Sequence, residues 1–154
     1  MLVAIAALTL LLGPAPTRRL ERPLIELHRS TLCGSWYAAI YSSGVAHSIA
    51  DDTCGNTDPS ARGSLLRRVS ARELSNLRKA IAVSRFREMP ASIEPDANTV
   101  VADEDVLTIM AWVGGTRYLV GAFGLERMPK SESASRFKAL WAAATAIAPD
   151  PIAK

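Results

Sequence analysis

The stretch VLTIMAWV-GG-TRYLVGAF, residues 106–123, decides the fold of this chain. Its two halves are rich in β-branched and aromatic residues, as strands are. Gly114-Gly115 between them is the kind of pair that a two-residue type I′ turn requires, because both turn positions have a positive φ. The sequence therefore predicts a β-hairpin in which Trp112 lies opposite Arg117, a geometry compatible with a cation–π contact.

Both faces of this hairpin are largely apolar. One face carries Leu107, Ile109, Ala111, Val113, Tyr118, Val120 and Ala122, and the other carries Val106, Thr108, Met110, Trp112, Arg117, Leu119 and Phe123. Either further layers cover both sides, or one face is an exposed interaction patch. Burial of both faces is the commoner arrangement and is our expectation. If the second face is exposed, then Met110, Trp112, Arg117 and Leu119 are candidates for contacting a partner.

A second hairpin is predicted over residues 36–49, where two apolar segments flank Ser42-Ser43-Gly44. A two-residue loop at Ser43-Gly44 would place Cys33 directly opposite Cys54, within reach of a disulfide bond. A three-residue loop with a glycine bulge would instead shift the register by one, and a bulge near Asp51 could then restore the pairing. Two buried free thiols are the alternative, but an oxidising compartment favours the disulfide.

The remaining elements complete an α+β pattern. Residues 23–29 and 64–69 read as strands, with turn-rich connections over 51–63 and 90–105. A capping box at 70–73 opens one helix, and Ser131 or Ser133 caps a second helix that stops before Pro149. The order strands, helix, strands, helix predicts an antiparallel sheet built from β-hairpins with two helices packed on it. With 154 residues, of which 49% are apolar, we expect a single domain over 18–154.

The first 17 residues hold no charged side chain and read as a signal peptide. Their apolar run of about twelve residues is shorter than a membrane-spanning helix requires. A buried N-terminal helix or strand is the alternative. Fourteen arginines against four lysines, with abundant alanine, suggest a GC-rich bacterial genome. We therefore expect a periplasmic or secreted bacterial protein.

Charge is unevenly distributed along the chain. Residues 62–87 hold eight basic side chains against Glu73 alone, whereas residues 88–105 hold six acidic side chains and no basic one. One interpretation is internal neutralisation of the two segments. The other is a two-signed surface that orients a protein partner, with Arg67, Arg68 and Arg72 among the contacts. Nucleic acid is a disfavoured partner, because the net charge is only +3 and aromatic residues do not interleave with the basic run.

Signals for catalysis or metal binding are weak. His28 and His47 lie on separate predicted strands and lack the spacing of a metal motif. A site that joins both to Asp51 or Asp52 is conceivable, but two partly exposed strand histidines are the simpler interpretation. No Gly-x-Ser-x-Gly or glycine-rich phosphate loop occurs. We therefore predict no catalytic residue, no metal and no cofactor.

The segment IELHRSTLCG at 25–34, then Tyr37, Tyr41, Gly44 and the SAREL segment at 70–74, resembles a family of small exported bacterial domains of unknown function. Its members show a Cys-x-Gly-x-Cys-Pro-x-Tyr segment, an Asp-Gly hairpin turn and a helix opening with Ser-x-Glu-Glu-Leu. This chain lacks the second cysteine and the proline of that segment, and Ser43 replaces the turn aspartate. The resemblance implies an exported α+β domain without an assigned activity.

These observations predict an exported envelope protein that acts as a non-catalytic protein-binding or structural domain, with another envelope protein as its partner. A periplasmic inhibitor or immunity-type protein is the alternative. A hydrolase or metal-binding protein would need His28 and His47 to converge with a carboxylate in one cleft.

Overall fold

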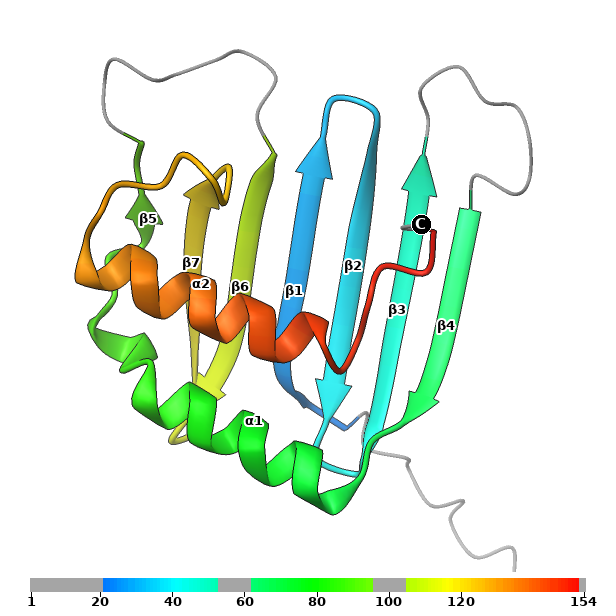
Figure 1. Ribbon diagram of the computed structural model, residues 1–154. Coiled ribbons are helices and arrows are strands. Elements are labelled where there is room, and N and C mark those ends of the chain that lie inside the picture. The colour runs from blue at the N-terminus through cyan, green and yellow to red at the C-terminus, as the bar shows by residue number, and fades with distance from the viewer. Residues whose placement is uncertain (1–20, 53–61, 96–104, 153–154) are drawn as a thin grey trace, which may run out of the picture.

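The computed structural model describes residues 21–52, 62–95 and 105–152 and has an α+β fold, which confirms the predicted class (Figure 1). Seven strands form one sheet in the order β4-β3-β2-β1-β6-β7-β5. The strands and helices are β1 (Pro23–Thr31), β2 (Gly34–Tyr41), β3 (Val45–Asp52), β4 (Arg62–Arg68), α1 (Ala71–Val83), the 3₁₀ turn η2 (Phe86–Glu88), β5 (Ser92–Ile93), β6 (Val106–Val113), β7 (Thr116–Phe123) and α2 (Glu132–Thr145).

The sheet is mixed because its last strand is parallel to its neighbour. All pairs are antiparallel except β5 with β7, where Ser92 pairs with Gly121 and Ile93 with Ala122. β5 lies inside the 90–105 segment that the sequence presented as a polar connection. A strand of two residues is too short to show an alternating pattern, so the sequence carried no periodic signal for it.

The hairpin of β6 and β7 has the predicted register. Val113 pairs with Thr116 and Trp112 with Arg117. Gly114 and Gly115 have φ values of 60° and 84°, the positive values that a type I′ turn needs. This hairpin was predictable because its turn and both of its strands are contiguous in sequence.

Of the two loops considered between β2 and β3, the two-residue loop is wrong and the three-residue loop is confirmed. Ile40 pairs with Ala46 and Gly34 with Asp52, so three residues, 42–44, form the loop. Gly44, with a φ of 83°, donates its N–H to the carbonyl of Tyr41 at 3.2 Å. A two-residue type I′ loop would need a positive φ at Ser43 as well, which serine adopts only at a cost.

The turn between β1 and β2 decides the place of the first cysteine. Cys33 lies in that turn, because Thr31 pairs with Gly34, and it is therefore not part of a strand. The β2–β3 ladder runs without a bulge to its last pair, Gly34 with Asp52. Cys54 lies outside the described residues, and the predicted disulfide therefore remains a prediction.

Both helices begin at the predicted caps. Ser70 accepts a hydrogen bond from the backbone of Glu73, and the Glu73 carboxylate accepts one from the backbone of Ser70, a complete capping box. Ser131 caps α2 by accepting from the N–H of Ala134. The apolar stripe of α2 is buried as expected, through Ala134, Phe137, Leu140, Trp141 and Ala144.

The core lies between the helices and one face of the sheet, because α1 and α2 pack on the same side (Figure 1). Trp36 of β2 meets Trp141 of α2 edge to face at 5.6 Å, and Phe137 stacks on Trp141 at 6.1 Å. Within the described part of the chain, no helix covers the other face. The expected burial of both faces of the β6–β7 hairpin is therefore wrong.

Candidate protein-binding face

The sheet surface turned away from the helices is defined by side-chain alternation and is called the open face below. Ile25, Leu27, Ile109 and Val120 point to the core, so their neighbours along each strand point the other way. The open face carries four exposed hydrophobic side chains: Leu66 (72% exposed), Leu119 (50%), Ile49 (44%) and Val106 (39%). A one-sided antiparallel sheet alternates apolar residues toward the core with polar residues toward solvent, and these four positions depart from that pattern.

Four residues proposed from the sequence lie together on the open face. Met110 pairs with Leu119, and the adjacent pair is Trp112 with Arg117. The guanidinium carbon of Arg117 lies 5.6 Å from the ring centroid of Trp112, and its Nη2 also contacts the sulfur of Met110. The two partners thereby hold the cation in place over an aromatic and thioether surface.

The middle of the open face contains Tyr37, which the sequence analysis placed in the family resemblance but not among the candidate contacts. The hydroxyl of Tyr37 hydrogen-bonds the side chain of Glu26. Partial burial, together with the negative charge of Glu26, raises the pKa of Tyr37 to about 12. Tyr37 lies opposite His28 on one side and opposite Ile49 on the other. Alternation along 34–41 puts Tyr37 and Trp36 on opposite faces of the sheet, but only the packing of α2 on Trp36 shows that Tyr37 is on the face without a helix.

The two histidines share the open face but do not converge. His28 pairs with Tyr37, whereas His47 pairs with Ala39, so two strand spacings and two residues separate them. That offset corresponds to about 12 Å between Cα atoms. His47 Nε2 lies 3.2 Å from Ser64 Oγ. Within residues 21–52, 62–95 and 105–152, no three His, Cys, Asp or Glu side chains are grouped to hold a metal ion.

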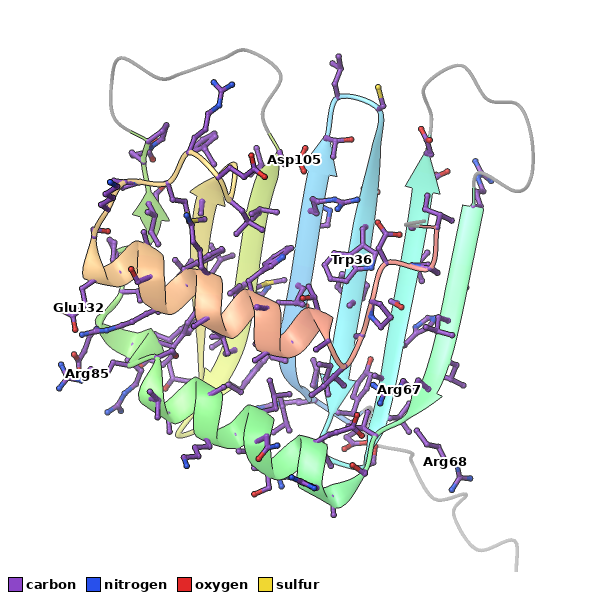
Figure 2. All side chains as sticks on the ribbon, viewed as in Figure 1. Trp36, Arg67, Arg68, Arg85, Asp105 and Glu132 are labelled. Atoms are coloured by element: carbon purple, nitrogen blue, oxygen red, sulfur yellow. The ribbon has the colours of Figure 1, made fainter. Side chains whose placement is uncertain are left out.

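The three proposed arginines do not form one patch. Arg67 points toward the helix layer, where it donates to the carbonyl of Ile147 at 2.6 Å and pairs with Glu73 (Figure 2). It therefore joins β4 to the start of α1 and to the segment after α2. Arg68 lies on the open face opposite Val45 at the edge strand, and Arg72 is exposed on α1. Only Arg68 shares a face with Trp112.

The acidic connection is described in part. Glu88 pairs with Arg85 at 3.6 Å, and Asp105 lies 3.9 Å from Arg29. Glu94 hydrogen-bonds Ser92. Asp96, Asp103 and Glu104 lie outside the described residues. Among the acidic residues that can be placed, Glu88 alone reaches the basic 62–87 segment, which gives limited internal neutralisation.

A hollow of about 550 Å³ lies on the opposite side of the molecule, between α1 and α2. Its lining combines four aliphatic residues with three uncharged polar ones and two cations, Lys79 and Arg136, of which Arg136 pairs with Glu132. No carboxylate, histidine or cysteine lines this hollow.

No family model and no curated protein matches this chain. The resemblance to small exported domains therefore stays a prediction. Of the helices in the described ranges, none has the length and hydropathy needed to cross a bilayer.

Proposed function

We propose that this chain is an exported bacterial envelope protein that binds another protein through the open face, without catalysing a reaction. The observation that carries the proposal is the composition of that face. Leu66, Ile49, Val106 and Leu119 are exposed there, and no described helix covers them. Contiguous exposed apolar surface marks interaction sites, and on β6 and β7 Leu119 adjoins Met110 and Trp112, so this part of the face is the centre of the proposed site.

The chemistry of the open face suits a protein more than a small ligand. Trp, Tyr, Met and Arg are the residues enriched at protein interfaces, and Tyr37, Met110, Trp112 and Arg117 supply all four types. Arg117 lies over Trp112, so part of its side-chain freedom is already lost before a partner binds. A broad sheet surface can be covered by a partner, whereas small molecules favour enclosed pockets.

The export part of the proposal rests on the apolar, uncharged segment 1–17. The Cys33–Cys54 disulfide belongs to the same proposal, because an oxidising compartment would form it. Gly34 pairs with Asp52, so Cys33 is one residue and Cys54 two residues beyond that pair. Such proximity in the chain is compatible with a bond between them.

Intact and non-reducing peptide mass analysis of protein recovered from the periplasm of a bacterial host tests export and the disulfide together. We expect a shortened chain in which one peptide pair joins Cys33 to Cys54. A full-length chain with two alkylatable thiols would contradict both.

Site-specific photo-crosslinking in the native envelope tests the binding face. A photoreactive residue replaces Leu119 in one strain and Ala142 in another; Ala142 is exposed on α2, on the opposite side of the molecule. We expect one discrete adduct from position 119 and none from position 142. Equal adduct patterns at both positions would contradict binding through the open face. If the captured partner is an enzyme that one equivalent of this protein inactivates, the inhibitor or immunity-type alternative applies.

A further inference from the structure

The outer edge of β4 presents backbone groups that no described segment pairs. The N–H of Val69 donates to the carbonyl of Gly44 at 2.9 Å, so Val69 directs its backbone groups toward β3. In an antiparallel pair the direction of the backbone groups alternates from one residue to the next. Residues 63, 65 and 67 therefore direct their backbone N–H and C=O toward β3, and residues 62, 64, 66 and 68 direct theirs outward. β4 is the terminal strand of the sheet, and among the described residues no backbone hydrogen bond reaches this outward set.

The side chains of the same outward set lie on the open face. Leu66 is 72% exposed between Ser64 and Arg68, and Arg62 lies at the beginning of the strand. Arg62 pairs with Asp51 at 3.1 Å, but its side chain is 77% exposed. A strand added to this edge would thus meet an arginine near each end and an apolar side chain between them.

Charge disfavours pairing of β4 with β4 of a second copy over the full length of the strand. Antiparallel pairing of β4 with β4 of another molecule, centred on Leu65, would set Arg62 against Arg68 twice. Like charges directly opposite each other destabilise a strand pair. A strand with an acidic residue opposite Arg62 and another opposite Arg68 would instead stabilise the pair. Charge complementarity therefore favours an acidic partner.

We propose that the β4 edge accepts an extended acidic segment of the partner protein as an eighth strand of the sheet. The segment carries acidic residues opposite Arg62 and Arg68, a small polar residue opposite Ser64 and an apolar residue opposite Leu66. The added strand continues the open face, so this inference rests on the proposed protein-binding function and specifies the chemistry of the partner. Main-chain hydrogen bonds supply affinity, and the alternate side chains supply selectivity.

A synthetic peptide, acetyl-ETVTTTE-amide, tests the proposal with the purified full-length protein. Its alternate residues place Glu, Val, Thr and Glu against positions 68, 66, 64 and 62 in an antiparallel pair. We expect saturable binding that weakens as salt rises, because the charges are exposed. Amide hydrogen exchange should slow at Ser64 and Leu66, whose N–H groups point outward, and stay unchanged at Leu65, whose N–H already points to β3.

The control peptide has lysine in place of both glutamates, and the matched protein variants are Ser64→Pro and Ser64→Ala. Proline at 64 removes one outward N–H while leaving the β3 ladder intact, as proline on an edge strand can. We expect Ser64→Pro to weaken binding about tenfold, and Ser64→Ala to bind normally although it loses the contact with His47. Circular dichroism checks that Ser64→Pro is folded. If it is not, the double variant Arg62→Glu/Arg68→Glu replaces it and should prefer the lysine peptide.

Equal binding of both peptides, absent protection at Ser64 and Leu66, or unchanged binding by the folded Ser64→Pro variant would each overturn the proposal. The crosslink from position 119 distinguishes failure of strand addition at β4 from failure of protein binding by the open face. If that crosslink persists while strand addition fails, the open face still binds a protein and only the acidic edge strand is excluded.

Discussion

Arg117 lies over the indole of Trp112, with the guanidinium carbon 5.6 Å from the ring centroid, on the surface of the sheet that the helices leave uncovered. The contact follows from register, since the two residues are a cross-strand pair next to the Gly114-Gly115 turn. We expect a double-mutant cycle of Trp112→Leu and Arg117→Leu to give a coupling of about 0.5–1 kcal/mol in the free energy of unfolding. Urea denaturation measures it. Strict additivity of the two substitutions would show that the contact contributes nothing.

The turn between β6 and β7 should tolerate asparagine better than alanine. Gly115 has a φ of 84°, and a Cβ added there meets no atom within 4 Å. Any cost is therefore a backbone cost, about 1–2 kcal/mol for Gly115→Ala and less for Gly115→Asn, because asparagine visits left-handed conformations more readily. Thermal denaturation of both variants checks the order. Equal melting temperatures for the two variants would argue against a strained backbone at this position.

Position 34 requires glycine because there is no space for a Cβ, and not because of a positive φ. A Cβ at Gly34 would lie 2.2 Å from the backbone oxygen of Asp51 in β3. We expect Gly34→Ala to force the β2–β3 pair apart and to destabilise the protein by about 3 kcal/mol. Gly121→Ala on β7 is the matched control, since its Cβ would have no neighbour closer than 3.8 Å. Chemical denaturation of the two variants should differ clearly; similar values would contradict the close approach of the strands.

The capping box of α1 gives the protein an acid-sensitive contribution to stability. Backbone and side-chain hydrogen bonds from Ser70, with a further one from Arg67, lower the pKa of Glu73 from 4.5 to about 2. Because the folded-state pKa is depressed, this stabilisation is complete above pH 4.5 and is lost as the pH falls toward 2.

Glu73→Gln should flatten the dependence of unfolding free energy on pH between those values. Ser70→Ala should cost about 1 kcal/mol at neutral pH through the lost N-cap. Denaturation curves at several pH values test both variants. A pH profile of Glu73→Gln that matches the parent protein would place the acid sensitivity elsewhere.

Tyr37 should ionise at higher pH than an ordinary tyrosine. Burial and the neighbouring Glu26 raise its pKa to about 12, so the neutral phenol is favoured in the folded protein. The corresponding stabilisation is fully present below pH 10 and is lost as the pH rises toward 12. Ultraviolet titration of the folded protein, compared with Tyr37→Phe, isolates this group. Glu26→Gln should lower the Tyr37 pKa, because it removes the negative charge; an unchanged value would leave burial as the whole cause.

Local patterns predicted the local parts of the fold. The glycine pair at 114–115 specified a hairpin and its register, and the SARE segment at 70–73 specified the start of α1. Each signal lies within a few residues of what it determines. The Trp112, Arg117, Met110 and Leu119 cluster could be anticipated for the same reason, since a hairpin register and side-chain alternation suffice to place it.

Other features depend on contacts between distant segments. The two-residue β5 pairs with β7 only after the chain has turned through α1 and η2, and no periodic pattern marks it. The loop at 42–44 gives a β2–β3 pairing that differs by one residue from that of a two-residue loop, and the separate turn between β1 and β2 holds Cys33. Tyr37 and Leu66 joined the candidate site because the sheet order brought β1 to β4 side by side.

The sequence by itself determined the α+β class, the β6–β7 hairpin and the caps of both helices, because turn geometry and helix termini are governed by neighbouring residues. Only the tertiary structure decided that both helices cover the same side of the sheet. Alternation separates the two faces of a strand but cannot say which one is buried when both are apolar. The packing of Trp36 against Trp141 places the helices on one face of the sheet, and Trp112, Arg117 and Leu66 lie on the other face, toward solvent.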